Sequence, residues 1–286
     1  MTRRAIFITG ASSGIGLASA LHLHRLDFRI LAGVLPGENT DALTEAGIDI
    51  VFIDLTRPEM IASAKDRIMR LVGAEGLYGL FNNAGYATSG PIEFLPIEVI
   101  RQQLEVNLFG HIQVTQGLLP LIRRTRGRIV NTNSILGRIV ATAFSSPYCM
   151  SKFAMEAFTD SLRLEMRPFG VSVSAIEPGV IRTPIWSKFK QDAEEILSEL
   201  PPEAQQLYGD DYVRLMLTSA QEGAQGIPPE AVAKAVAHAF TARRPKTRYI
   251  VGADAKAVMA LRMILSDRAL DWVLRWRYPT TTKNTL

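Results

Sequence analysis

The chain has 286 residues, of which 47% are hydrophobic and 21% charged, and its formal net charge is +4. This composition excludes a disordered chain, and the length permits one large α/β domain, which we expect to span residues 1–286. A single cysteine excludes an intramolecular disulfide, so we expect a cytoplasmic protein. Because no apolar run reaches the roughly 18 residues of a membrane-crossing helix, we predict no membrane span.

Charge is distributed unevenly along the chain. Residues 241–286 carry ten Lys or Arg and three Asp or Glu, or +7, which leaves 22 minus 25, or −3, for the other 240 residues. A basic C-terminal region favours contact with an anionic surface. The more ordinary interpretation is a basic face exposed to solvent. A second basic cluster at residues 123–128 has no interleaved aromatic residues that could stack on bases, so we predict no nucleic-acid partner.

In chain order, short β-branched runs alternate with longer segments of helical period, a pattern typical of a doubly wound parallel sheet in an α/β fold. We predict strands at Ala5–Thr9, Arg29–Val34, Ile48–Ile53, Leu77–Asn82, Arg128–Thr132 and Val171–Ile176, with a seventh near Thr247–Val251. We predict crossover helices at Leu17–Leu26, Pro58–Leu71, Pro96–Ile122 and Tyr148–Arg167.

The rhythm changes after Pro184. Residues 184–228 include a polar, acidic, helix-prone stretch, Lys188–Glu222, which we interpret as a substrate lid because both flanks belong to one sheet. Its apolar anchors are Trp186, Phe189, Tyr208 and Tyr212. Residues 253–286 form a basic C-terminal extension. Within it, residues 257–279, which include Trp272 and Trp276, are expected to pack on the lid and pocket, with a subunit contact and a membrane surface as alternatives.

A glycine-rich turn follows the first predicted strand directly. It reads Thr9-Gly10-Ala11-Ser12-Ser13-Gly14-Ile15-Gly16 and leads into a predicted helix. Glycines allow a tight turn and a close approach of the backbone to a pyrophosphate, whose charge is favoured at a helix N-terminus. Taken alone, the turn could also be a mere connector.

Further motifs occur at the ends of the later strands. They are Asp54-Leu55, Asn82-Asn83-Ala84-Gly85, Asn107 in a helix, Ser134, Tyr148-Cys-Met-Ser-Lys152, and the segment Pro178-Gly179-Val-Ile181-Arg-Thr183. Singly, each has an ordinary interpretation, such as a strand-terminal turn or a surface Tyr–Lys pair. Six motifs in register with predicted strand ends over about 180 residues are not a coincidence.

Together these motifs resemble the short-chain dehydrogenase/reductase family, whose opening motif is Thr-Gly-x-x-x-Gly-x-Gly. The resemblance implies a single-domain Rossmann fold and an NAD(P)-dependent enzyme that interconverts an alcohol and a ketone or aldehyde. It implies that the catalytic residues are Asn107, Ser134, Tyr148 and Lys152. It implies that the cofactor is held by Thr9, Gly10, Ser12, Ser13, Gly14, Ile15, Gly16, Gly33, Asp54, Leu55, Asn83, Ala84, Gly85, Tyr148, Lys152, Pro178, Gly179, Ile181 and Thr183.

The chemistry requires residues of these types. A tyrosine of pKa about 10 is mostly protonated at neutral pH, so a base is obtained only if nearby positive charge favours the phenolate. Lys152 lies one helical turn after Tyr148, and the oxidised nicotinamide adds a second positive charge. Lowering the pKa by about 3 units represents about 4 kcal/mol. The resemblance further implies that Ser134 hydrogen-bonds the substrate oxygen and that Asn107 positions a water that links Lys152 to solvent.

The sequence also bears on a metal site and on the choice between NAD and NADP. The four histidines, His22, His24, His111 and His238, have no metal-ligand spacing, so we predict no metal site. In the resembling family an acidic residue at the end of the second strand favours NAD and a basic one favours NADP. That position is Gly33 here, so the choice between NAD and NADP stays open.

A narrower resemblance concerns the last third of the chain. Leu207-Tyr208-Gly209-x-x-Tyr212 and Arg248-Tyr249-x-x-Gly252-x-Asp254-Ala255-Lys256 are similar to the branch containing retinol dehydrogenases and 17β-hydroxysteroid dehydrogenases. This implies a bulky apolar alcohol or ketone as substrate, with a small polar hydroxy acid as the alternative. A non-catalytic cofactor-binding regulator is the alternative outside the enzymes. We also expect a homo-oligomer.

Overall fold

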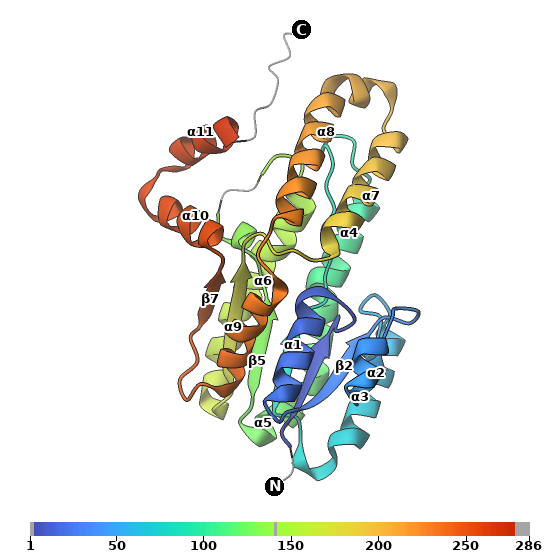
Figure 1. Ribbon diagram of the computed structural model, residues 1–286, viewed down its shortest axis with the longest axis vertical. Coiled ribbons are helices and arrows are strands. Elements are labelled where there is room, and N and C mark those ends of the chain that lie inside the picture. Colours follow the sequence, from blue (N-terminus) through green and yellow to red (C-terminus); the bar gives the residue numbers. More distant parts are fainter. Residues whose placement is uncertain (1–2, 140–141, 278–286) are drawn as a thin grey trace.

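The computed structural model describes residues 3–139 and 142–277. Within these residues, seven parallel strands form one sheet in the order β3-β2-β1-β4-β5-β6-β7, which confirms the predicted doubly wound sheet (Figure 1). The strands are β1 (Ala5–Thr9), β2 (Arg29–Val34), β3 (Asp49–Phe52), β4 (Gly79–Asn82), β5 (Arg128–Thr132), β6 (Ser172–Pro178) and β7 (Arg248–Val251). Because the winding reverses between β1 and β4, a ligand is expected beyond the carboxyl ends of these strands.

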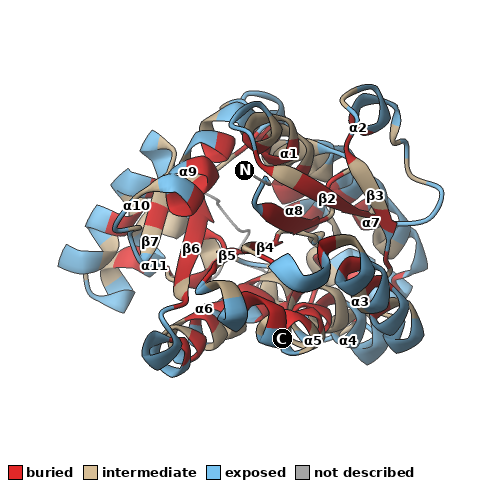
Figure 2. Cartoon of the chain, turned by 90° about the horizontal axis from the view of Figure 1, so that it is seen from below, coloured by how far each residue is buried: buried red, intermediate tan, exposed pale blue. Residues whose placement is uncertain are grey.

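Helices cover both faces of the sheet (Figure 2). One face carries α3 (Pro58–Val72), α5 (Gly110–Thr125) and α6 (Ser146–Met166), and the other carries α1 (Gly14–Arg25), α2 (Asp41–Glu45) and α9 (Pro229–Thr241). The central strands are apolar at successive positions because each side of the sheet is buried; every residue of β1 is buried. Short 3₁₀ turns occupy η1 (Gly73–Glu75), η3 (Ile135–Gly137) and η4 (Arg167–Phe169).

The segment predicted as one helix, Pro96–Ile122, is interrupted. It consists of α4 (Ile97–Leu104), a π-helical turn η2 (Glu105–Phe109) and α5. A π turn adds one residue to a helical turn, which apolar periodicity does not reveal. The sequence analysis also did not anticipate α2 and α9, whereas β1, β2 and β5 begin and end where predicted.

Beyond β6 the chain leaves the sheet as a pair of helices, α7 (Ile185–Glu199) and α8 (Pro202–Ala224), which stand above the carboxyl ends of the strands in Figure 1. We call residues 184–228 the helical insertion. It has a small core of its own, formed by Phe189, Ala193, Tyr212, Leu215 and Met216. After β7 follow α10 (Ala253–Ile264) and α11 (Asp267–Arg277). The side chain of Trp276 and residues 278–279 lie outside the described residues.

Candidate active site

The turn between β1 and α1 has glycines at positions where the space or the backbone conformation excludes a side chain. Gly10 has φ +63, and a Cβ there would lie 2.8 Å from the Cα of Ala84. A Cβ on Gly16 would overlap the Gly10 carbonyl oxygen, and Gly14, with φ +53, faces Thr183. In the described chain the Ser13 side chain at the N-cap of α1 bonds no helix amide. The first-turn amides are therefore available, and the cradle fits a pyrophosphate.

Side chains from β1 and β4 hold this turn in place. The Thr9 hydroxyl accepts hydrogen bonds from the amides of Asn83 and Ala84, at 2.9 and 3.0 Å. The Asn83 side-chain amide donates to the carbonyl oxygens of Thr9 and Gly10, at 3.0 and 3.1 Å. The Asn-Asn-Ala-Gly segment thus braces the glycine turn, and Gly85 at its end is exposed.

His111 has a role here that the sequence analysis did not assign. Its Nε2 lies 2.7 Å from the Ala84 carbonyl oxygen. Burial lowers the pKa of His111 to about 4, so the ring is neutral and Nε2–H donates this bond. His111 therefore supports the same loop from α5. The only sequence signal is its place one turn after Asn107.

Three predicted cofactor-binding residues, Gly33, Asp54 and Leu55, lie at or just after the ends of β2 and β3. The Asp54 carboxylate accepts hydrogen bonds from the Thr56 amide and hydroxyl, at 2.9 and 2.7 Å, and so caps its own turn. Leu55 is buried in the core beside Gly110. A Cβ on Gly33 would lie 2.9 Å from both the Ile8 carbonyl oxygen and the Phe7 ring. Position 33 therefore has no space for the acidic side chain that would decide the cofactor choice.

Tyr148 and Lys152 meet at the start of α6, above the carboxyl end of β5. The Lys152 Nζ lies 5.7 Å from the centroid of the Tyr148 ring and donates to the Thr132 carbonyl oxygen at 2.8 Å. Ser134, two residues beyond Thr132, is buried and hydrogen-bonds Tyr148. The three predicted residues are thus brought together, with Lys152 held by the strand that precedes Ser134.

The two ionisable groups are strongly affected by burial. Desolvation raises the pKa of Tyr148 to about 12, although the hydrogen bond from Ser134 opposes this. Desolvation lowers the pKa of Lys152 to about 8, although the charge of Glu156 opposes this. The expected lowering of the tyrosine pKa is therefore absent from the chain by itself, since burial outweighs the hydrogen bond from Ser134.

Asn107 lies in the π turn η2 and is 1% exposed. Its side-chain amide donates to the Tyr86 carbonyl oxygen at 2.9 Å and to the Ser151 hydroxyl at 3.1 Å. Its oxygen accepts from the Tyr86 amide at 3.2 Å. Asn107 thus links the loop after Gly85 to α6, next to Lys152 in the sequence.

The end of β6 completes the site. Gly179 donates its amide to the Val251 carbonyl oxygen at 2.9 Å, and a Cβ there would overlap the Asp254 carboxylate. Ile181 is buried, and its carbonyl oxygen accepts from the Trp186 indole at 2.7 Å. Pro178 and Thr183 flank this segment, which runs from β6 to a position beside Gly14.

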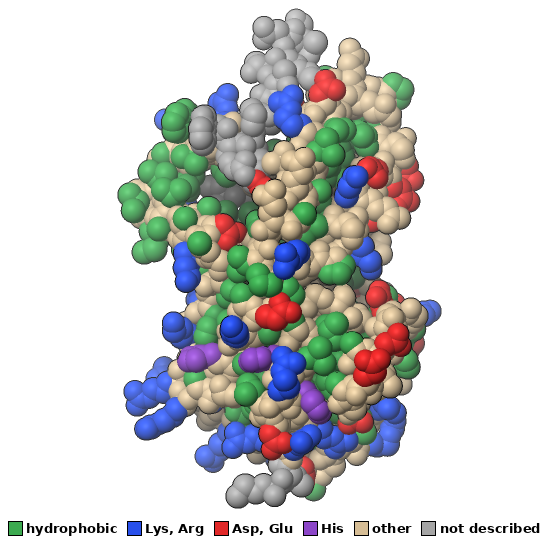
Figure 3. All heavy atoms as spheres, in the orientation of Figure 1, with side chains coloured by type: hydrophobic (Ala, Val, Ile, Leu, Met, Phe, Trp, Pro, Cys, Tyr) green, Lys and Arg blue, Asp and Glu red, His purple; other side chains and the backbone are tan. Residues whose placement is uncertain are grey.

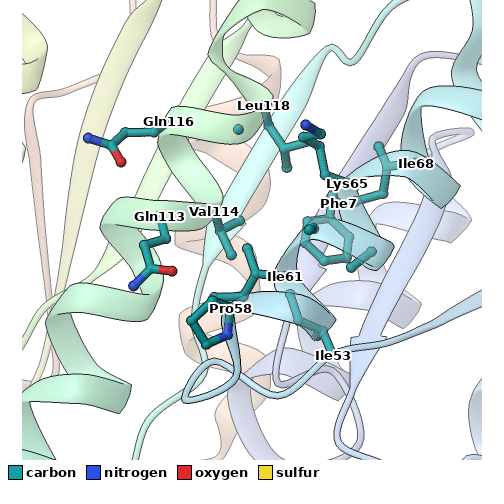
Figure 4. A pocket seen from close by; sticks show the side chains of 13 residues that line it. Phe7, Ile53, Pro58, Ile61, Lys65, Ile68, Gln113, Val114, Gln116 and Leu118 are labelled. Atoms are coloured by element: carbon teal, nitrogen blue, oxygen red, sulfur yellow. The ribbon is translucent and has the colours of Figure 1, made fainter.

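A separate hollow lies between α3 and α5 (Figure 4). It measures about 290 Å³ and is lined mainly by apolar side chains, among them Ile61, Ile68 and Leu118, with Lys65 at one side. No predicted site residue lines it. Among the residues that the structure describes, no group of three His, Cys, Asp or Glu is arranged to hold a metal, and no helix is long and apolar enough to cross a membrane.

Known proteins resemble this chain over nearly its whole length. The family model described as short chain dehydrogenase matches residues 4–194. Retinol dehydrogenase 5 of Mus musculus is 40% identical over 283 residues, covering 96% of this chain and 88% of that protein. The 17-beta-hydroxysteroid dehydrogenase type 6 of Bos taurus is 38% identical over 282 residues, with the same shares covered.

A solved structure agrees. A short chain dehydrogenase from Burkholderia cenocepacia J2315 in complex with NADP has a TM-score of 0.70 and 25% identity, and 98% of each chain is covered. The family match covers more than half of the chain, and both relatives exceed 30% identity over most of it. The chain therefore belongs to the short-chain dehydrogenase family and is an NAD(P)-dependent oxidoreductase that interconverts an alcohol and a carbonyl compound.

Proposed function

We propose that Tyr148 is the proton-transfer residue and that Lys152, Ser134 and Asn107 assist it. The observation that carries the proposal is the contact of Lys152 with both the Tyr148 ring and the strand before Ser134. Ser134 donates to the substrate oxygen, Tyr148 exchanges a proton with it, and the Lys152 ammonium favours the phenolate. Asn107 keeps the loop after Gly85 and α6 in register.

We propose that the glycine turn, the Asn83–Gly85 loop, Asp54 and the Pro178–Thr183 segment hold the cofactor. The cradle around Gly10, Gly14 and Gly16 supports this, since it offers backbone amides, has no space for a Cβ at Gly10 or Gly16, and holds Gly14 at φ +53. When bound, the nicotinamide supplies hydride chemistry and, in its oxidised form, a positive charge. Both NAD and NADP are compatible with a Gly33 that carries no charge.

We propose a bulky apolar alcohol or ketone, of the retinoid or hydroxysteroid kind, as the substrate, with the helical insertion as its lid. The insertion contacts the segments that follow β2 and β4. Lys188 lies 3.5 Å from Glu38 after β2, and the buried Tyr212 hydroxyl bonds the Ser89 hydroxyl and carbonyl oxygen, each at 3.0 Å. Its apolar core at Phe189, Tyr212 and Met216 supports an apolar enclosure.

The test is turnover of all-trans-retinol, estradiol and a short hydroxy acid with NAD⁺ and NADP⁺, followed by nicotinamide absorbance. Tyr148→Phe should reduce kcat at least about 100-fold, the effect of losing a general acid or base, and leave NADH binding unchanged within about twofold. Tyr78→Phe, which loses a hydroxyl bonded to Phe240 at the other end of the sheet, serves as the control. Turnover of the hydroxy acid alone would overturn the substrate class. NADH binding without turnover of any substrate would favour the alternative of a non-catalytic cofactor-binding regulator.

We also propose that the C-terminal helices contact an anionic lipid surface. Met263 and Ile264 on α10 are 82% and 80% exposed, and Trp272 on α11 is 70% exposed; apolar side chains gather in this region in Figure 3. Arg262 and Arg268 lie nearby in the sequence. The first half of α10 instead packs on Ile135 and Ile139, so pocket packing accounts for only part of the extension.

Sedimentation with vesicles of phosphatidylserine and phosphatidylcholine tests this contact. The wild type should cosediment, and the triple variant Met263→Ser, Ile264→Ser, Trp272→Ser should stay in the supernatant with unchanged kcat. Equal sedimentation of both proteins would contradict it.

We propose self-association through the exposed apolar side chains Phe109, Met150 and Phe153, where η2 lies against α6. Light scattering of Phe153→Glu, expected to be monomeric, tests the proposal.

A further inference from the structure

Arg248, at the start of β7, contacts three carboxylates that belong to two other elements. Its Nη2 lies 2.8 Å from Glu156 and 2.7 Å from Asp160, which are one turn apart on α6. Its Nε lies 3.0 Å from a carboxylate oxygen of Glu177 on β6. The side chains of Glu156 and Glu177 are 10% and 0% exposed. One partly buried guanidinium therefore joins α6 to β6.

Two of the three carboxylates, Glu156 and Glu177, are also tied to the segment that carries Ser134. The Asn133 side-chain amide donates to Glu156, and Arg138, just after η3, lies 3.1 Å from Glu177. Along the chain, Asn133 precedes Ser134, Glu156 follows Lys152 by one helical turn, and Glu177 precedes Pro178. The charged cluster of Arg138, Glu156, Glu177 and Arg248 thus connects the segment that carries Ser134, the helix that carries Tyr148 and Lys152, and the end of β6.

The stretch from Arg248 to Asp254 also holds the segment after Pro178 through a second contact. Asp254, six residues after Arg248, accepts a hydrogen bond from the Val180 amide at 2.7 Å. Gly252 adopts φ +115, and Gly179 has no space for a Cβ because the Asp254 carboxylate lies there. The motif Arg248-Tyr249-x-x-Gly252-x-Asp254 therefore clamps β6 and the turn beyond it from the side of β7.

Stability alone does not explain such a cluster. Buried ion pairs are replaced by apolar residues at little or no loss of stability, because the desolvation of the charges offsets their attraction. What the planar guanidinium adds is orientation, since its donors bind carboxylates only in a fixed geometry. A cluster placed around Lys152 and Pro178 is suited to fix these two groups relative to each other.

We propose that Arg248 is a positioning residue for hydride transfer: through Glu156 and Glu177 it holds α6, with Tyr148 and Lys152, in register with the Pro178–Val180 turn. The inference rests on the proposed function, because it assigns the reaction to these residues. Arg248 itself touches none of the reacting groups. A register error of about 1 Å costs about 100-fold in rate when reacting groups must be aligned.

The experiment compares Arg248→Lys and Arg248→Met with Arg163→Met. Arg163 pairs with Asp160 at the exposed edge of the cluster and contacts neither Glu156 nor Glu177, so it controls for the loss of a cation. We expect kcat with estradiol or retinol to fall about 10-fold in Arg248→Lys and about 100-fold in Arg248→Met, with KM changed less than about threefold. The pH profile of kcat should move in both variants and stay unchanged in Arg163→Met.

A second variant, Glu177→Gln, and a measurement of NADH binding complete the experiment. If Arg248→Met does not fold, Glu177→Gln, which keeps the shape and removes the charge that Arg248 binds, should lower kcat by at least about 10-fold. NADH binding, followed by nicotinamide fluorescence without substrate, should weaken and lose its fluorescence enhancement in the Arg248 variants, because the Pro178–Val180 turn shifts. A wild-type kcat and pH profile in Arg248→Lys and Glu177→Gln would overturn the inference, as would an equal loss in Arg163→Met. Absence of wild-type turnover would instead defeat the proposed function, and the fluorescence arm would still decide the role of Arg248.

Discussion

The carboxyl edge of β1 and β4 and the helical insertion above it are specified in different ways. At the edge, Gly10 and Gly16 have no space for a Cβ, and Thr9 and Asn83 bond the main chain of the turn. In the insertion, apolar side chains pack on one another, and Gly209 on α8 has open space around its Cα. The glycine turn of the proposed cofactor site thus depends on single residue types. Most of the helical insertion depends instead on an apolar pattern that different residues can satisfy, apart from Gly223 against the Trp186 ring and Gly226 against the Arg182 main chain.

The sharpest test of this contrast is Gly16→Ala. The added Cβ would overlap the Gly10 carbonyl oxygen, which is main chain and cannot rotate away. Overpacking costs up to about 3 kcal/mol, so we expect NADH binding to weaken about 100-fold, or the variant not to fold. Isothermal titration with NADH and thermal melting distinguish the two. Binding within twofold of the wild type would show that the turn adapts, and the contrast with the insertion would fail.

The dependence of the rate on pH should also come from the edge of the sheet. Burial lowers the pKa of Lys152 from 10.5 to about 8, so its ammonium is present below pH 8 and lost above it. Tyr148, with a pKa of about 12, stays protonated over this range, as carbonyl reduction requires. We expect kcat/KM for reduction, which reports the free enzyme, to fall about tenfold per unit above pH 8.

Asp192, on α7 of the insertion, provides the control for that profile. Burial and the charge of Glu195 raise its pKa, and its charge is among the groups that raise the pKa of Tyr86. It is not among the groups that alter the pKa of Lys152. Asp192→Asn should therefore leave the alkaline limb in place, and a shifted limb would mean that the insertion controls the titration.

The same contrast explains which parts the sequence could predict. The strands β1, β2 and β5 follow from local patterns, because residue type and spacing determine them. The grouping of Tyr148, Lys152 and Ser134 was expected from the family resemblance instead. The π turn at Asn107 could not be predicted, since one added residue leaves the apolar pattern almost unchanged. The bonds of His111 to Ala84 and of Arg248 to Glu177 join residues far apart in the sequence. Gly33 shows the converse, because its place at the end of the second strand is where the resembling family can carry a carboxylate, which packing against Phe7 rules out here.

Within the insertion, Tyr212→Phe should have a moderate and local effect. The buried hydroxyl bonds Ser89 and so ties the core of the insertion to the loop after Gly85. Losing this hydrogen bond costs about 1 kcal/mol, which corresponds to a severalfold rise in KM for an apolar substrate, with NADH affinity unchanged. Steady-state kinetics and NADH titration measure both quantities. A loss of NADH affinity instead would mean that the insertion and the cofactor side form one unit.

The smallest effect, and one of opposite sign, is expected for Gly209→Ala. Gly209 lies inside α8, and a Cβ there meets no atom within 4 Å. Alanine is favoured over glycine inside a helix by about 0.5–1 kcal/mol, so the free energy of unfolding should rise by about that amount in urea titration. Gly117→Ala in α5 is the matched variant on the sheet, where the Cβ would lie 3.3 Å from the Lys65 side chain, and the crowding offsets part of the gain. If Gly209→Ala destabilised the protein while Gly117→Ala did not, tight packing would belong to the insertion as well, and residue type rather than apolar pattern would specify both halves.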